Sequence, residues 1–251
     1  MIRAMGSATP KVRVDVGAGG AVWRLVLNRA AKLNALDEDI RIGLQDAVDR
    51  VAERADVRVV VLAGAGRAFS AGADLHDRPR ARTSAPRRAS GAWQRLLDSL
   101  ERLPQVTVAR LHGHVIGGAA LLAAACDLRV GADDVTVAIP EVALGIPLTW
   151  AGLPRLAREI GVSRTRDLVM TGRSLGAGEA EAWGYLHRVV GPDQLDETVE
   201  ALTATLAAQP ADALAMTVDA LRALGRAVSA PEMAWADPDL LRWSLRDGRR
   251  R

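Results

Sequence analysis

The stretch His112–Asp127 reads H-G-H-V-I-G-G-A-A-L-L-A-A-A-C-D, and the rest of the chain is interpreted around it. An apolar run at 106–111 precedes it, and its two adjacent glycines lead into an Ala/Leu segment of high helix propensity. The pattern predicts a strand, a tight turn and a helix. Glycine lets the backbone approach a ligand closely, and the N–H groups at a helix start carry partial positive charge. We therefore expect this turn to hold a negatively charged oxygen.

A second turn of small residues follows the apolar run at 57–63. It lies within Gly64–Leu75, which reads G-A-G-R-A-F-S-A-G-A-D-L. Two such turns can each give one N–H to the same oxygen, which is how an oxyanion hole is built. The sequence thus favours an enzyme that stabilises a developing oxyanion.

Composition limits the class of protein. The chain has 251 residues, 49% of them hydrophobic, which is enough for one large domain with a sizeable core. Its single cysteine, Cys126, excludes an internal disulfide, and no apolar run or leader-like N-terminus indicates a membrane or export, so we expect a cytoplasmic protein without membrane contact.

Arginines gather at Arg78–Arg88 and Arg246–Arg251, either on solvated segments or near the mouth of a site for phosphates. No aromatic platform accompanies them, which argues against nucleic acid.

Periodicity predicts an α/β protein, because strand candidates alternate with helix candidates as far as Pro192. A hairpin opens the chain, and beyond Pro192 only helical spacing is found. Asp37 is expected to cap the first long helix, and the apolar stripe on the helix at 93–103 is interpreted as core packing. The expected strands are 12–16, 22–27, 58–63, 106–111, 128–131 and 135–139, and the other expected helices follow Gly118 and cover 153–160 and 163–171.

Several sequence blocks occur in the order found in one known family. They are N-R-A-A-K-L-N-A-L (28–36), F-S-A-G-A-D-L (69–75), H-G-H-V-I-G-G-A (112–119), C-D-L-R-V (126–130), I-P-E-V-A-L-G (139–145), M-T-G-R (170–173) and A-x-x-W-G-Y-L-H-R-V-V (180–190). Together they resemble the crotonase superfamily, the enoyl-CoA hydratase/isomerase group. The resemblance implies a crotonase-like spiral of repeated ββα units over residues 11–192. It also implies a C-terminal helical oligomerisation region at 193–251, with 1–10 disordered, and a homotrimer or homohexamer.

The resemblance also implies a substrate and a site. The substrate is an acyl-CoA thioester, with no cofactor and no metal. The backbone N–H groups of Ala73 and Gly118 correspond to the oxyanion hole, and Glu141 to an acid/base residue. The expected substrate-binding residues are Lys32, Ala35, Ala71, Asp74, Leu75, Gly117, Leu121, Pro140 and Trp150. From the residues alone, the default interpretation of Lys32 is an exposed loop lysine, and that of Asp74 is a residue that orients its turn. Trp150 is equally a core side chain.

One departure from the family pattern decides the expected chemistry. Hydratases of the family use two glutamates, and Leu121 stands where the first belongs. One carboxylate is enough to move a proton between two carbons, so we expect an enoyl-CoA isomerase with Glu141 as its only acid/base, its pKa raised by Ile139, Val142, Leu144 and Ile146. The alternatives are a hydratase (lyase) with a second carboxylate from Asp77, Glu232 or Asp237, and a non-catalytic acyl-CoA-binding paralogue.

Other enzyme classes fit the sequence less well. His112 and His114 would share a strand face, but no third metal ligand has a suitable spacing. Ser70 lacks the preceding glycine of a nucleophile elbow, because Ala68 takes that place. A dinucleotide fingerprint starting at Gly64 fails because Phe69 stands where its third glycine belongs.

Overall fold

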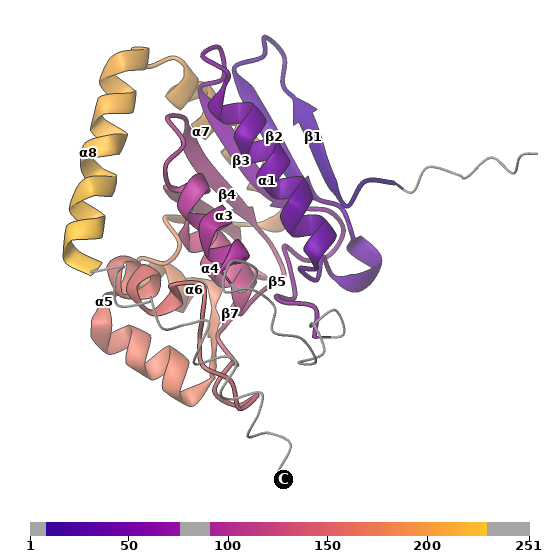
Figure 1. Ribbon diagram of the computed structural model, residues 1–251, viewed down its shortest axis with the longest axis vertical. Helices are drawn as coiled ribbons and strands as arrows, with labels where there is room; N and C mark the ends of the chain where they lie inside the picture. The colour runs from indigo at the N-terminus through magenta and orange to yellow at the C-terminus, as the bar shows by residue number, and fades with distance from the viewer. Residues whose placement is uncertain (1–8, 76–90, 230–251) are drawn as a thin grey trace, which may run out of the picture.

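The computed structural model describes residues 9–75 and 91–229, in which two β-sheets are layered with helices (Figure 1). The larger sheet has the strand order β1-β2-β3-β4-β6-β9, with β1 antiparallel to β2 and parallel pairing in the rest. Its strands are β1 (Val12–Val16), β2 (Val22–Leu27), β3 (Val59–Gly64), β4 (Val106–Leu111), β6 (Leu128–Ala132) and β9 (Arg188–Val190). The predicted α/β class and opening hairpin are confirmed.

The smaller sheet contains β5 (His114–Ile116), β7 (Thr136–Ala138) and β8 (Ser174–Gly176). The chain leaves the large sheet after β4 and enters the small one at β5. Gly113 makes this change of direction with φ of 54°, and a Cβ there would lie 2.4 Å from the carbonyl oxygen of Arg67. The expectation that the strand at 106–111 leads directly into the turn was therefore incomplete. Three-residue strands such as β5, β8 and β9 are too short to give a periodic signal.

Helices cover both faces of the large sheet. The helices α1 (Glu38–Ala52) and α3 (Ala92–Leu100) lie side by side on one face, in front of the sheet in Figure 1. Asp37 caps α1 as predicted, because its Oδ1 accepts a hydrogen bond of 2.9 Å from Ile40 N. The helix α7 (Leu195–Ala207) packs its Val199 against valines of the opposite face, including Val61 and Val108. Strands covered on both faces explain the continuous apolar run of β3.

The helix α4 (Gly118–Ala124) is central, and all of its residues are buried. The Tyr185 hydroxyl donates a buried hydrogen bond of 2.8 Å to Ala120 O and so holds α4 in place. The predicted helices at 153–160 and 163–171 form α5 (Gly152–Thr171), which is broken at Gly161, where φ is 79°. The remaining elements are the short α6 (Ala177–Ala182), the 3₁₀ turns η1 (Ala30–Lys32) and η2 (Pro192–Gln194), and α8 (Ala211–Ser229).

The helix α8 runs along the side of the molecule against α5 (Figure 1). Arg222 ties it to the core, since its Nε donates a 2.7 Å hydrogen bond to Asp127 Oδ1. Among the described residues, no helix is long and apolar enough to cross a membrane. The calls for residues 1–8 and for both arginine-rich segments fall outside the described residues.

Candidate active site

The two small-residue turns lie against each other. Hydrogen bonds run between the segments that lead into them: Phe69 N donates to His112 O at 2.8 Å, and Ser70 N to His114 O at 2.9 Å. A Cβ on Gly72 would lie 2.4 Å from Ile116 O and 3.7 Å from Gly118 N. Gly72 has φ of 84°, so both the conformation and the close approach require glycine. The structure therefore brings Ala73 next to the start of α4.

The N–H groups of Ala73 and Gly118 are available as donors. Ala73 is bridged to Leu36 through its neighbours: Leu36 N donates to Gly72 O (2.8 Å), and Asp74 N donates to Leu36 O (2.9 Å). The Ala73 N–H thus points away from Leu36. Gly118 is the first residue of α4, so its N–H has no intrahelical acceptor. Neither N–H donates to any described residue, which is the arrangement that a two-donor oxyanion hole needs.

Each glycine of the pair has a functional candidate packed onto it. A Cβ on Gly117 would lie 2.6 Å from Oε1 of Glu141, and a Cβ on Gly118 would lie 2.2 Å from Cζ3 of Trp150. A larger residue at either position would displace the carboxylate or the indole. The glycine pair thus brings Glu141 and Trp150 to the start of α4.

Leu121 belongs to the core and brings no polar group to the site. Its side chain is 1% exposed and packs with Leu148 against Gly152, where a Cβ would lie 2.8 Å from Leu121 Cδ1. In the described part of the chain, no group of three or more His, Cys, Asp or Glu side chains could hold a metal ion. The proposed second carboxylates, Asp77, Glu232 and Asp237, lie outside the described residues. Glu141 is therefore the carboxylate that the described structure places at the glycine pair.

Asn34 connects the turn to the N-terminal block. It is fully buried with φ of 53°, and its Nδ2 lies 2.8 Å from Ala65 O, 2.9 Å from Ala68 O and 3.1 Å from Phe69 O. The backbone carbonyl of Asn34 accepts a hydrogen bond of 2.8 Å from Ser70 Oγ. The Ser70 hydroxyl in turn accepts one of 3.1 Å from Gly72 N. The side chain and the backbone carbonyl of Asn34 thereby fix the segment that leads to Ala73.

Replacing Asn34 with alanine is expected to lower the free energy of unfolding by about 3 kcal/mol, because the surrounding carbonyls lose the two N–H donors of the amide and Arg29 N loses its acceptor. Urea unfolding followed by circular dichroism measures this. Asn28→Ala is the matched control: its amide donates to Pro10 O at an exposed position, so we expect a change of at most ~0.5 kcal/mol. Equal stabilities of the two variants would contradict this role of Asn34.

Arg29 holds Asp74 in place. Its Nη1 donates to Asp74 Oδ2 at 2.6 Å and to Ala35 O at 3.0 Å, and it lies 3.4 Å from Asp37 Oδ2. The Asp74 side chain is 10% exposed. Asp74 therefore orients its turn, and Ala35 contributes its carbonyl to the same contact.

The other predicted substrate-binding residues lie around this centre. Ala71 is fixed by a 2.9 Å hydrogen bond from its N–H to Leu33 O, and Pro140 directly precedes Glu141. Lys32 in η1 and Leu75 are exposed, so both are accessible to a ligand. The expected apolar enclosure of Glu141 is only partly found. Ile139 is buried, whereas Val142 and Leu144 are about half exposed, because the segment forms turns at the surface.

Sequence reasoning missed several residues of this region. Trp93 packs against the core as predicted, but its stacking on Trp150, with ring centroids 4.6 Å apart, was not predicted. Helical spacing alone could not separate it from Leu96 and Leu97, which are buried as predicted. The expected common strand face of His112 and His114 was wrong, because Gly113 turns the chain between them and His112 Nε2 lies 2.8 Å from Gly66 O. Arg29 and Asn34 stood within a quoted block, yet spacing gave no hint of their partners.

Comparison with known proteins identifies the family of the chain. The model of the enoyl-CoA hydratase/isomerase family matches residues 17–241. This chain belongs to the enoyl-CoA hydratase/isomerase family. Its fold is the crotonase fold, as in an enoyl-CoA hydratase from Mycobacterium avium subsp. paratuberculosis, with a TM-score of 0.85, 26% identity and 95% coverage of both chains.

Two further solved members of the family are named for different reactions. An enoyl-CoA hydratase from Bacillus anthracis is 33% identical, with a TM-score of 0.78 over 84% of this chain and 82% of that one. A monofunctional enoyl-CoA isomerase from Mycobacterium smegmatis is 29% identical, with a TM-score of 0.74 over 86% of this chain and 94% of that one. Overall similarity therefore identifies an enzyme of the enoyl-CoA hydratase/isomerase family, and the reaction has to be argued from the site.

Proposed function

We propose that this protein is an enoyl-CoA isomerase that uses Glu141 as its only acid/base. The observation that carries the proposal is the pairing of the glycine turn with one carboxylate: Glu141 Oε1 lies 2.6 Å from a Cβ placed on Gly117, whereas Leu121 is buried in the core. A hydratase needs one group to activate water and another to handle the α-proton. A double-bond shift needs only one group that carries a proton between two carbons.

The reaction proceeds through a dienolate. The carboxylate of Glu141 removes a proton from the α-carbon of a β,γ-unsaturated thioester, and the electron pair moves into the conjugated system that ends at the thioester oxygen. The N–H groups of Ala73 and Gly118 stabilise that oxygen, and they do so strongly because they are fixed before charge develops. Glu141 then returns its proton to the γ-carbon, which leaves the double bond between the α- and β-carbons.

The proposal is tested by incubating the purified protein with vinylacetyl-CoA and, separately, with crotonyl-CoA and water. We expect vinylacetyl-CoA to become crotonyl-CoA without accumulation of β-hydroxybutyryl-CoA. Liquid chromatography separates and quantifies the three thioesters. Hydration as fast as isomerisation would favour the hydratase with a second acid/base group. Binding without any conversion would favour a non-catalytic acyl-CoA-binding paralogue.

We further propose that the protein works in the cytoplasm as a homotrimer or homohexamer with acyl-CoA as its ligand and no cofactor. Burial raises the pKa of the Cys126 thiol to about 12, so this thiol stays protonated near neutral pH. The helix α8 leaves Met216, Leu221 and Leu224 exposed by 73%, 63% and 62%. Such apolar side chains on one element are typical of a surface that packs against another subunit.

The change of Leu221 and Leu224 to glutamate is expected to shift the protein from the trimeric or hexameric mass to a smaller species, because charge is depleted from interface cores. Light scattering coupled to size-exclusion chromatography gives the mass. Glu200→Gln on α7 serves as a surface control that keeps the assembly. A wild-type protein that is monomeric at all concentrations would contradict the proposed assembly.

A further inference from the structure

Trp150 stands in a backbone conformation that side chains rarely adopt. Its φ is 63°, and that of Ala151 is 53°, both in the left-handed region. Two consecutive non-glycine residues there are costly, and they persist only where the surroundings fix them. Strain of this kind is concentrated at functional sites, so the contacts that hold Trp150 indicate what its side chain does.

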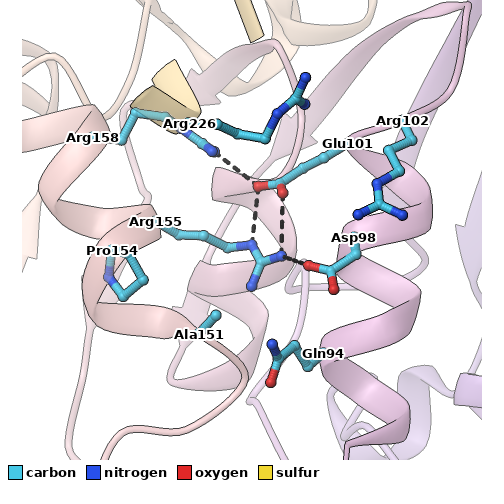
Figure 2. A pocket seen from close by; sticks show the side chains of 9 residues that line it. All are labelled: Gln94, Asp98, Glu101, Arg102, Ala151, Pro154, Arg155, Arg158 and Arg226. Carbon is cyan, nitrogen blue, oxygen red and sulfur yellow. Dashed lines mark hydrogen bonds and ion pairs between the residues drawn. The ribbon is translucent and has the colours of Figure 1, made fainter. Parts of the chain in front are cut away.

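Arg155 is the group that holds the backbone of Trp150. Its guanidinium is 4% exposed and donates from Nη1 to the Trp150 carbonyl oxygen. The other nitrogens bind carboxylates of the α3 region: Nε lies 2.9 Å from Glu101 Oε1, and Nη2 donates to Asp98. Figure 2 shows this fork, with Arg158 also directed at Glu101 and donating to it at 2.9 Å. A planar, bidentate guanidinium fixes direction as well as charge.

The indole of Trp150 is fixed on two sides. One face stacks on Trp93 of α3, with centroids 4.6 Å apart and an angle of 13° between the planes. Its edge lies on Gly118, where a Cβ would be 2.2 Å from Cζ3 and 2.5 Å from Cη2. The cavity of about 100 Å³ in this region is lined by Gln94, Asp98, Ala151 and Arg155 among others, and neither the glycine pair nor Glu141 lines it. The ring is therefore a fixed wall beside the proposed oxyanion donor.

We propose that Trp150, positioned by Arg155 and Trp93, limits the length of the acyl chain, so that the site takes short-chain acyl thioesters. The inference rests on the proposed function, which puts the thioester oxygen at Gly118 N. A chain that extends past Gly118 along α4 meets the indole edge and then Leu121 and Leu148, which are 1% and 6% exposed. A close-packed interior admits further methylene groups only by displacing side chains.

The test measures affinity for saturated, unreactive thioesters, so that it does not depend on turnover. Titration calorimetry compares butyryl-CoA with decanoyl-CoA for the wild type, Trp150→Ala and Trp150→Phe. We expect the wild type to bind butyryl-CoA at least about tenfold more tightly, Trp150→Ala to remove that preference, and Trp150→Phe to be intermediate. Trp183→Phe, at the partly buried residue that follows α6, is the matched control and should keep the wild-type preference.

Arg155 is tested as a positioning residue by Arg155→Lys. This change keeps the positive charge but removes the planar guanidinium that makes several hydrogen bonds at once. The stacked indoles should give an exciton couplet in far-ultraviolet circular dichroism that disappears equally in Trp93→Phe and Trp150→Phe. We expect Arg155→Lys to weaken the couplet and the preference for butyryl-CoA together. A variant that keeps both unchanged would remove Arg155 from this role.

The outcomes separate this inference from the proposed function. Short-chain preference without isomerisation supports the wall and overturns the isomerase. Isomerisation with equal affinity for butyryl-CoA and decanoyl-CoA overturns the wall alone, as does a Trp150→Ala variant that folds and retains the wild-type preference. Failure of every thioester to bind overturns both.

Discussion

Glu141→Gln is expected to reduce the isomerisation of vinylacetyl-CoA by about 10³-fold, because an amide cannot accept the α-proton. The shape of the residue is preserved, so its contact with Gly117 should remain. Affinity for butyryl-CoA should therefore change by no more than about tenfold. Initial rates and calorimetric titration on the same protein preparation measure the two quantities.

Glu53→Gln is the matched control, because Glu53 is an exposed residue at the end of α1. Its turnover should equal that of the wild type. A Glu141→Gln variant with more than about a tenth of the wild-type rate would exclude Glu141 as the acid/base, since general acid–base catalysis contributes at least ~10²-fold.

The second large effect is expected at the N–H of Gly118. A Cβ at this position overlaps the Trp150 ring, so the comparison is made in the Trp150→Ala background, which has room for it. There, Gly118→Ala keeps the donor and Gly118→Pro removes it. We expect Gly118→Pro to be slower than Gly118→Ala by about 10²–10³-fold in kcat, which is typical for the loss of one oxyanion donor.

Both substitutions add a Cβ, so their difference isolates the hydrogen bond from the steric change. Circular dichroism and thermal unfolding establish that both proteins are folded. Equal kcat values in two folded variants would mean that Gly118 N–H does not stabilise the oxyanion, and the oxyanion hole would have to be sought elsewhere.

The elements that could be predicted from the sequence are those whose signals lie within a few consecutive residues. The helix α1 could be predicted because its cap and its apolar stripe lie within one short segment, and the stripe residues Ile40, Leu44, Ala47, Val48 and Val51 are all buried. The strand β3 was predicted from its continuous apolar run. That run reflects the burial of both faces of the strand. Short strands such as β5 and β8 depend on pairing with distant segments and leave no periodic pattern.

The site shows the same division. The glycine pair and Glu141 could be named from the ordered blocks, but their mutual contact depends on the fold. The sequence also could not show why position 118 requires glycine. In the structure, the indole of Trp150 occupies the space that a side chain of Gly118 would need. Arg155 was not predicted at all: its partners Asp98 and Glu101 lie more than fifty positions earlier, and no local pattern connects them.

The measurement that tests the central claim most directly is the fate of the α-hydrogen. Vinylacetyl-CoA deuterated at the α-carbon is incubated with the enzyme in ordinary water, and the crotonyl-CoA formed at early times is analysed by NMR. If one carboxylate carries the proton, part of the product holds deuterium at the γ-carbon, and Glu141→Gln forms no such product. A γ-methyl group whose new hydrogen comes entirely from water, together with β-hydroxybutyryl-CoA, would contradict the one-glutamate isomerase.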